Sequence, residues 1–248
     1  MSKVVLVTGG GRGIGAATAR LLAKHGYDLA VNYQSNITAV GKVVAEIRAM
    51  GRRALAIQGD VAKESDVTRM FEAIDEHLGP LHGLVNNAGI TGRIGRLDDA
   101  SAETIQSTMD INVVGALLCA REAVKRMSTK HEGAGGVIVN ISSVATTLGS
   151  PNTYVWYAAS KGAIDAVTLG LGLEVAREGI RVVGVAAGMT DTDLHAAGGQ
   201  PDRAQKIGPG IPLGRVAQPA DIAEAVVWLM SDAARYCTAT TLRVGGGR

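Results

Sequence analysis

The alternation of short apolar runs with longer amphipathic segments constrains the fold more than any other feature. Seven apolar runs predict strands, over residues 4–7, 29–33, 54–58, 81–87, 136–142, 180–187 and 241–244. Apolar residues at helical spacing predict helices between them, over residues 14–25, 37–50, 64–78, 102–127, 157–178 and 219–231. Uninterrupted apolar strands are buried on both faces, as in a parallel sheet. The pattern therefore predicts an α/β fold with a doubly wound, seven-stranded parallel sheet between two helical layers.

The length of 248 residues suits a single α/β domain, since such domains often run to about 200–250 residues. Hydrophobic residues make up 46% and aromatic residues only 3%, so the core must consist mostly of Ala, Val, Ile and Leu. No linker or low-complexity tract interrupts the pattern, which predicts one domain over residues 1–248. The least regular region is 189–215, and its Gly and Pro content predicts a mobile substrate lid.

Composition excludes several classes of function. The net charge is +2, with 25 basic and 23 acidic residues well mixed, which predicts neither a nucleic-acid partner nor a membrane patch. No apolar window reaches about 18 residues, and the first apolar run is too short for a signal peptide, so we expect a cytoplasmic protein. Cys119 and Cys237 form no CxxC pair, and no His/Cys/Asp cluster has metal-ligand spacing. We therefore predict no metal, with Cys119 in the core.

The turn after the first strand reads TGGGRGIG, residues 8–15, and opens the first helix. Gly9, Gly13 and Gly15 allow the backbone to approach a pyrophosphate, and the helix that begins near Ile14 offers N–H donors and a partial positive charge. A P-loop is excluded because no Lys-Ser/Thr follows the glycines. The context predicts a dinucleotide site, and a merely tight turn is the alternative.

The end of the second strand indicates which dinucleotide binds. An NAD-type site has an acidic residue about 20 residues after the glycines, but residues 32–35 read NYQS. Arg12 lies inside the glycine turn, where a guanidinium would pair with a 2′-phosphate. We therefore predict NADP rather than NAD as the cofactor, with Asn32 and Tyr33 beside the adenosine. The alternative is that Arg12 is an ordinary surface side chain.

Several motifs together resemble those of the short-chain dehydrogenase/reductase family. TGGGRGIG, GDV at 59–61, NNAG at 86–89, Asn112, Ser143 and YAASK at 157–161 occur in the family's order and cover nearly the whole chain. The resemblance implies a single Rossmann-type domain, often assembled as a homotetramer. Within such an assembly, helices 102–127 and 157–178 would form a four-helix dimer interface.

The resemblance also implies an oxidoreductase that transfers a hydride between NADP(H) and a small-molecule carbonyl or secondary alcohol. The whole-chain pattern is close both to 3-oxoacyl-carrier-protein reductases and to sugar dehydrogenases such as glucose 1-dehydrogenase. The sequence does not choose between them, nor does it give the direction of the reaction. A non-catalytic NADP-binding sensor or scaffold is the alternative outside the enzyme class.

In this family the tyrosine of YAASK, Tyr157, is the general acid/base, and Lys161 lowers its pKa and holds the nicotinamide ribose. The physical chemistry agrees, because residues four apart on a helix share one face and a cation stabilises a phenolate whose ordinary pKa is about 10. Ser143, at the end of the fifth strand, would bond the substrate oxygen, and Asn112 would hold a relay water. If each motif is considered alone, there are two alternatives. Tyr157 and Lys161 would form a solvated pair on a helix surface, and Ser143 would only cap a turn. Tyr154 lies outside the motif.

The remaining cofactor contacts are also implied by the resemblance. With the glycine turn and the YAASK pair, the set includes Asp60, Val61, Asn86, Ala88, Gly89, Gly188, Thr190 and Thr192. Asp60 would bind the adenine amine, and an Asp that only caps the next helix is the alternative.

This chain departs from the family pattern at several positions. Ala187 replaces the usual Pro, which predicts a looser turn after the sixth strand, and Ala239 replaces a usual Gly. The gap between Ser143 and Tyr157 is one residue longer than is common, so loop 144–156 should bulge. His195 lies in the predicted lid, where an exposed side chain is expected rather than a substrate contact.

Overall fold

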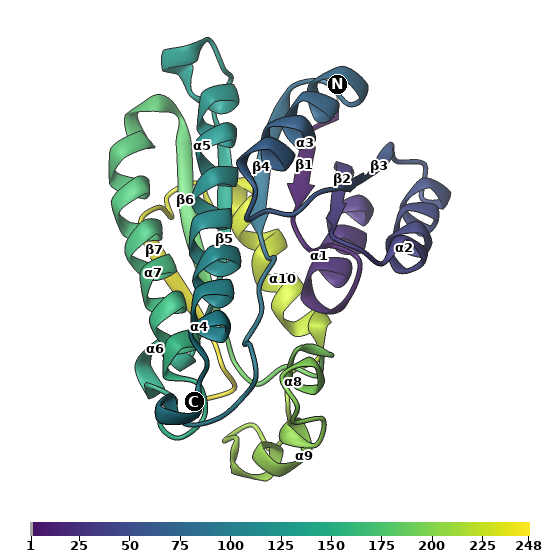
Figure 1. The fold of residues 1–248 in the computed structure, drawn as a ribbon. Helices are drawn as coiled ribbons and strands as arrows, with labels where there is room; N and C mark the ends of the chain where they lie inside the picture. Colours follow the sequence, from purple (N-terminus) through teal and green to yellow (C-terminus); the bar gives the residue numbers. More distant parts are fainter. Residues whose placement is uncertain (1) are drawn as a thin grey trace.

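The computed structural model describes residues 2–248, and seven parallel strands form its central sheet (Figure 1). The strands are β1 (Val4–Val7), β2 (Asp28–Tyr33), β3 (Ala54–Gln58), β4 (Leu81–Asn86), β5 (Gly136–Ser143), β6 (Ile180–Ala187) and β7 (Thr240–Val244). Their order across the sheet is β3-β2-β1-β4-β5-β6-β7, so the direction of winding reverses between β1 and β4. This confirms the predicted Rossmann-type sheet and leaves a crevice at the carboxyl ends of β1 and β4.

Helices connect the strands and cover both faces of the sheet (Figure 1). The longer helices are α1 (Gly13–Lys24), α2 (Ile37–Ala49), α3 (Glu64–His77), α4 (Ala102–Met109), α5 (Gly115–Met127), α7 (Val155–Val175) and α10 (Pro219–Met230). The shorter ones are α6 (Ala145–Leu148), α8 (Leu194–Ala197) and α9 (Arg203–Ile207). No helix within residues 2–248 is both long enough and apolar enough to cross a membrane.

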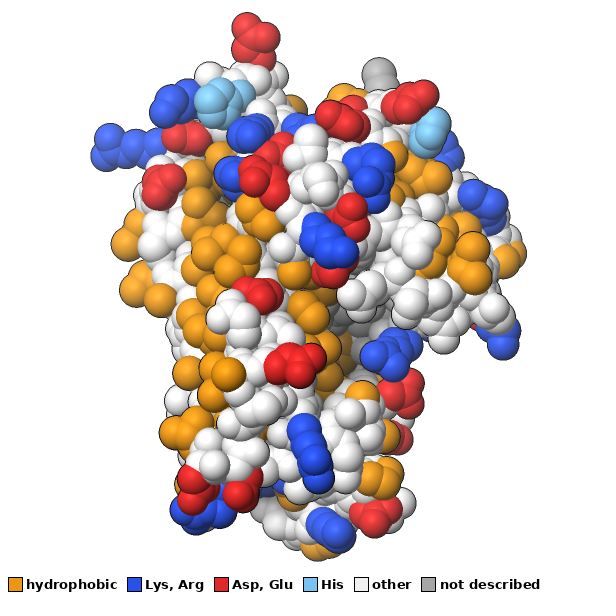
Figure 2. Space-filling view, viewed as in Figure 1, with side chains coloured by type: hydrophobic (Ala, Val, Ile, Leu, Met, Phe, Trp, Pro, Cys, Tyr) orange, Lys and Arg blue, Asp and Glu red, His pale blue; other side chains and the backbone are white. Residues whose placement is uncertain are grey.

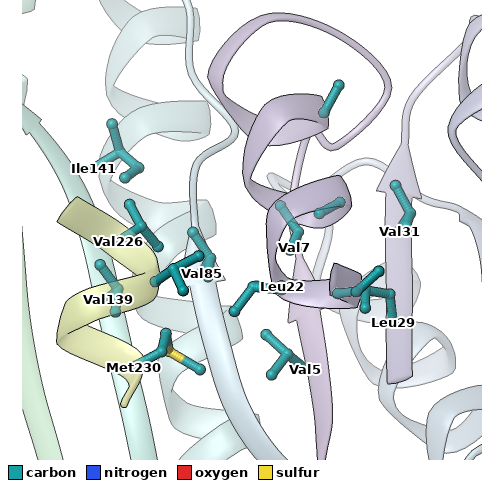
Figure 3. Packing of buried hydrophobic residues seen from close by; sticks show 14 of the residues in the cluster. Val5, Val7, Leu22, Leu29, Val31, Val85, Val139, Ile141, Val226 and Met230 are labelled. Atoms are coloured by element: carbon teal, nitrogen blue, oxygen red, sulfur yellow. The ribbon is translucent and has the colours of Figure 1, made fainter. Parts of the chain in front are cut away.

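Two apolar layers hold the sheet between the helices. In β1, Val5 and Val7 belong to the layer that packs under α1, α2 and α10, where Leu22 and Met230 meet them (Figure 3). The alternate residues of β1 belong to the opposite layer, with α3 and α5, and Cys119 is buried there as predicted. Burial of each large apolar side chain contributes about 1.5–3 kcal/mol. Edge strands β3 and β7 are partly exposed, so the predicted burial on both faces holds for the inner strands, where at most one residue of each is only half-buried.

The segment predicted as one helix over 102–127 is interrupted. A π-helical turn, Asp110–Val114, separates α4 from α5 and contains the buried Asn112. Asn112 accepts a hydrogen bond from the backbone N–H of Ile90 at 2.8 Å and donates one to its carbonyl oxygen at 2.8 Å. Its amide also donates to Ser160 Oγ at 3.0 Å. We attribute the extra residue of the π turn to these contacts, which require Asn112 to face the β4 loop.

Two regions outside the main elements shape the crevice. The 189–215 segment is more regular than expected, because it contains α8 and α9, and the Gly198 carbonyl accepts a hydrogen bond from the N–H of Ile94 at 2.9 Å. Loop 144–156 contains α6 and then two left-handed residues, Ser150 (φ 52°) and Asn152 (φ 59°). These positive φ values are uncommon for residues other than glycine and mark the tight path of this longer loop.

The two departures from the family pattern lie beside β6. The carbonyl of Ala187 accepts a hydrogen bond from the N–H of Val144 at 3.0 Å, and the N–H of Gly188 donates to the Val244 carbonyl at 2.9 Å. The turn after β6 is thus tied to both neighbouring strands without a proline. Ala239 adopts φ 54°, a left-handed conformation in which glycine carries no steric cost.

Candidate active site

A cavity of about 680 Å³ opens at the carboxyl ends of the central strands, where the winding reverses. Most of the residues predicted for the site line it. These are Gly9, Arg12, Gly13, Ile14, Asn32, Tyr33, Asp60, Val61, Ala88, Gly89, Ser143, Tyr157, Lys161, Gly188, Thr190 and Thr192. Three predicted residues, Gly15, Asn86 and Asn112, do not line it.

The glycine turn has the shape of a cradle for a pyrophosphate. Gly9 and Gly13 have φ of +61° and +52°, and a Cβ on Gly13 would lie 3.2 Å from Thr192 Cγ2. A Cβ on Gly15 would lie 2.4 Å from Asn87 Nδ2, so Gly15 serves the close packing of the turn on the β4 loop. The N-terminus of α1 follows directly, and its free N–H groups favour an anion. These residues therefore fit a dinucleotide.

The part of the cavity predicted to hold the adenosine is lined by residues 33–36, at the end of β2 and just after it, and none of these carries a carboxylate. Arg12 lies beside it, with Nη1 4.0 Å from Asp193 of the 189–215 segment, and both side chains are exposed. Asp60 lines the cavity and also accepts a hydrogen bond from the N–H of Ala62 at 3.0 Å. Asp60 therefore caps a local turn before α3 and not the helix itself, whose N-cap is Lys63, and it still lines the cavity.

Three of the predicted asparagines hold the scaffold together. Asn32 accepts a hydrogen bond from the N–H of Gly9 at 3.1 Å and thereby fixes the glycine turn against β2. Asn86 donates to a carbonyl on α5 at 3.1 Å and to Asn140 Oδ1, on the neighbouring inner strand β5, at 3.0 Å. Its side chain thus supports the centre of the sheet and does not face the cavity. The side-chain amide of Asn112 likewise forms hydrogen bonds with the backbone of Ile90, in the loop after β4.

Tyr157 and Lys161 lie one turn apart on α7, and both are buried. Lys161 Nζ donates to the carbonyl oxygen of Ile141 at 2.7 Å and lies 5.8 Å from the centre of the Tyr157 ring. Ser143, at the end of β5, accepts a hydrogen bond from the N–H of Ala145 at 3.1 Å and also lines the cavity. The solvated-pair alternative for YAASK is therefore wrong, and Ser143 both caps a turn and faces the site.

Burial dominates the ionisation of this pair. Burial raises the pKa of Tyr157, Tyr154 adds to the increase, and a hydrogen bond with Ser143 opposes it. Burial also lowers the pKa of Lys161 to about 8, with Asp165 opposing. The expectation that Lys161 would bring the pKa of Tyr157 down is therefore not met, because desolvation of the phenolate outweighs the nearby cation. At neutral pH Tyr157 is a phenol that carries a proton to donate.

Three further residues line the cavity beyond Tyr157, and the motifs did not identify them. Tyr154 packs edge-to-face on Tyr157 with ring centres 5.0 Å apart, and Arg203 Cζ lies 5.0 Å from the centre of the Tyr154 ring. His195 is only 9% exposed, so the expectation of an exposed side chain is wrong. The docking of the 189–215 segment on the Ile94 loop buries His195, and sequence periodicity carries no signal for that contact.

Known proteins are similar to this chain over nearly its whole length. The sequence model of the family described as enoyl-(acyl carrier protein) reductase matches residues 9–248. The uncharacterized oxidoreductase YgfF of Escherichia coli is 51% identical over 245 residues, which cover 99% of this chain and 99% of that protein. A 3-oxoacyl-[acyl-carrier-protein] reductase FabG of Staphylococcus aureus is 38% identical, with 100% and 98% covered. Glucose 1-dehydrogenase 2 of Bacillus subtilis is 34% identical, with 99% and 94% covered.

Solved structures show the same fold with nicotinamide dinucleotides bound. A short chain dehydrogenase from Burkholderia cenocepacia in complex with NADP has a TM-score of 0.90 and 35% identity, covering 99% of this chain and 97% of that one. A 3-ketoacyl-(acyl-carrier-protein) reductase from Brucella melitensis complexed with NADH has a TM-score of 0.91 and 33% identity, with 99% and 98% covered. The relatives thus include both NADP and NADH complexes.

The burial of His195 predicts a pH-dependent stability. Burial, assisted by the charge of Arg203, lowers the pKa of His195 to about 4, from an ordinary value of 6.5. Between pH 6.5 and 4 the unfolded chain binds more protons than the folded chain, so the free energy of unfolding falls as the pH falls. The expected loss between pH 7 and 5 is about 2 kcal/mol. Urea unfolding of the wild type and His195→Gln at both pH values measures it as the difference between the two proteins.

The matched control is His25→Gln, which makes the same replacement at an exposed position after α1. His25→Gln should follow the wild type at both pH values. An unchanged difference between the wild type and His195→Gln at pH 7 and pH 5 would mean that His195 titrates alike in the folded and unfolded chains.

Proposed function

From the premise that this chain belongs to the short-chain dehydrogenase/reductase family, we propose that it is an NADP-dependent oxidoreductase acting on a carbonyl or secondary alcohol. The observation that carries the proposal is one cavity that contains the glycine turn, Ser143, Tyr157 and Lys161. A non-catalytic dinucleotide sensor has no use for a buried phenol and a buried amine at the same cavity wall. We therefore favour an enzyme over a sensor or scaffold.

NADP(H), when bound, supplies or accepts the hydride at its nicotinamide ring. The Ser143 hydroxyl would donate a hydrogen bond to the substrate oxygen and stabilise the charge that develops there. Tyr157 would transfer its phenolic proton to that oxygen as the carbonyl is reduced, and take it back in the reverse direction. The raised pKa of Tyr157 keeps the proton in place at neutral pH, which suits the direction of carbonyl reduction.

Lys161 has two roles in this proposal. Its buried amine, with a pKa near 8, would bind the ribose hydroxyls beside the nicotinamide and exchange protons with Tyr157. The bond from Nζ to the Ile141 carbonyl fixes the amine between β5 and α7, so that it does not swing away from the site. Asn112, on the other side of Gly89, would contribute through the backbone of its π turn rather than through its fully bonded amide.

The preference for NADP is supported at the adenosine end. Residues 33–36 offer polar groups and the N-terminus of α2, where a 2′-phosphate meets N–H donors and no opposing carboxylate. Arg12 lies next to them and would pair with the phosphate in exchange for its distant contact with Asp193. Gly188, Thr190 and Thr192 would hold the nicotinamide end and the pyrophosphate.

We propose further that the 189–215 segment is the substrate lid and that the protein works in the cytoplasm as a homotetramer or homodimer. The free thiols of Cys119 and Cys237 suit a reducing compartment. Hydrophobic side chains gather over α5 and α7, on the left of Figure 2. The exposed ones include Leu117, Leu169 and Leu173, with Val114 of the π turn that precedes α5. An exposed apolar face of this kind on two adjacent helices suits contact with a second copy.

The first prediction from the proposed function tests the acid/base role. Tyr157→Phe removes the proton donor but keeps the ring, so kcat/KM should fall by about 10²–10⁴ while NADPH still binds. The assay follows NADPH absorbance with 3-oxoacyl thioesters, diketones and aldehydes, and the reverse reaction with sugars and secondary alcohols. Tyr236→Phe, the same change at a fully exposed position, should retain wild-type rates. Turnover by Tyr157→Phe close to the wild-type rate would exclude this mechanism.

The second prediction concerns the cofactor. NADPH should bind more tightly than NADH, and Arg12→Gln should reduce that ratio about tenfold without changing the affinity for NADH, because only the 2′-phosphate loses a charged partner. Fluorescence titration of both cofactors measures the ratio. Arg20→Gln, on the same turn-helix unit but paired with Glu46 outside the cavity, is the charge-matched control. A wild-type ratio at or below one would refute the NADP preference.

The third prediction concerns assembly. Light scattering should give four or two times the 25.5 kDa mass of one chain. Leu173→Glu should lower the mass, because Leu173 is 68% exposed in the apolar face of α7 and a buried carboxylate there is costly. Ile37→Glu, equally exposed but on α2 at the far side of the molecule, should not change it. A wild-type mass of one chain would contradict the assembly.

A further inference from the structure

The cavity is lined by a cationic side chain, Arg203, which forms no ion pair with a carboxylate of residues 2–248. Arg203, at the start of α9, donates from Nη1 to Gln200 Oε1 at 2.9 Å and from Nη2 to the Tyr154 hydroxyl at 3.4 Å. Both partners are neutral, and its buried Nε has no hydrogen-bond partner among residues 2–248. A buried donor without a partner costs about 1–3 kcal/mol, and more for a charged group. A negatively charged ligand in the cavity would give this guanidinium the charged partner that it lacks.

His195 presents a second unsatisfied group at the same wall. The ring is more than nine-tenths buried, lines the cavity, and its Nδ1 has no partner within the described part of the chain. Arg203 is close enough to influence the ionisation of the ring. A neutral imidazole has one N–H to donate, so His195 and Arg203 together offer an imidazole donor and a guanidinium at the lining of the same cavity.

We propose that Arg203 and His195 bind a carboxylate of the substrate, and that the enzyme therefore acts on oxo acids or the corresponding hydroxy acids. This inference rests on the proposed function and adds the substrate class to it. A guanidinium matches a carboxylate in shape and charge, and one cation beside a neutral imidazole balances a single negative charge. A phosphate, which carries nearly two charges, is less well matched. A neutral sugar or the thioester end of an acyl chain would leave Arg203 unpaired.

The spacing of the rings indicates the scale of such a substrate. The centre of the Tyr154 ring lies 5.0 Å from Arg203 Cζ and 5.0 Å from the centre of the Tyr157 ring. Arg203 Cζ therefore lies at most two such distances from the centre of the ring that carries the proton donor. Apolar side chains line the same cavity, from Leu148, Leu194 and Ile207. A few methylene groups between the carbonyl and the carboxylate would pack against them.

The test compares each acid with its own neutral ester. The substrates are 2-oxopentanoate, 4-oxopentanoate and 5-oxohexanoate with their methyl esters, assayed with NADPH for kcat and KM. The wild type should prefer at least one acid over its ester by about 10- to 100-fold in kcat/KM, the range expected for charge-assisted hydrogen bonds. Arg203→Gln should bring that ratio close to one, mainly through a higher KM of the acid, and Arg203→Lys should restore part of it.

The matched control is Lys206→Gln, which removes a positive charge from the same helix at an exposed position outside the cavity. It should retain the wild-type ratio, since a general loss of positive potential would change both variants alike. Calorimetric titration of the same acids into the NADP⁺-loaded protein gives a second readout. Binding should be detected for the wild type and lost in Arg203→Gln, whether or not the acid is turned over.

The outcomes separate this inference from the proposed function. Reduction of esters and other neutral ketones as efficient as that of every acid would overturn the carboxylate site and leave the reductase intact. An unchanged acid-to-ester ratio in Arg203→Gln would do the same, and would assign Arg203 only to stacking on Tyr154. If no carbonyl is reduced, calorimetry decides: acid binding that depends on Arg203 supports the site, and no binding by the wild type overturns it.

Discussion

The hydrogen bonds that join the carboxyl ends of β1 and β4 are the contacts on which the rest of the site depends. Thr8 Oγ1 accepts from the backbone N–H groups of Asn87 and Ala88, both at 3.0 Å, and Asn87 Nδ2 returns a hydrogen bond to the Thr8 carbonyl at 2.8 Å. The two strands diverge into helices on opposite faces at this point, so the sheet has no ladder left to hold them together. These bonds fix the floor of the cavity, and the glycine turn lies directly on it.

The sequence predicted those parts of the molecule that short-range patterns determine. Alternating apolar runs gave the strands to within a residue or two, and the YAASK and glycine motifs located Tyr157, Lys161 and the cofactor turn. The sequence did not predict positions that depend on contacts between distant parts of the chain. The π turn at Asn112 exists because of a loop 22 residues earlier in the chain, and the burial of His195 depends on how the 189–215 segment docks. Neither contact corresponds to a periodic pattern of residues in the sequence.

The pKa of Tyr157 is another property that the sequence pattern did not predict. The spacing of a phenol and an ammonium on one helix face predicts attraction and a lower pKa for the tyrosine. Complete burial reverses the balance, since both the phenolate and the ammonium lose hydration, and the pKa of Lys161 falls as that of Tyr157 rises. Within the proposed function, Tyr157 therefore keeps its proton at neutral pH. The arrangement suits a proton donor that acts once negative charge develops on the substrate oxygen.

The 189–215 segment connects the two ends of the cavity, which gives the proposed lid a specific role. Its first residues face the cofactor end, where Thr192 contacts the glycine turn and Asp193 approaches Arg12. Its later residues, His195 and Arg203, face the substrate end. In the proposed complexes, a phosphate bound by Arg12 would replace its contact with Asp193, and a carboxylate bound by Arg203 would hold α9 against Tyr154. In this proposal, residues at the strand ends would carry out the chemistry. The 189–215 segment, which would contact both cofactor and substrate, would determine the substrate specificity.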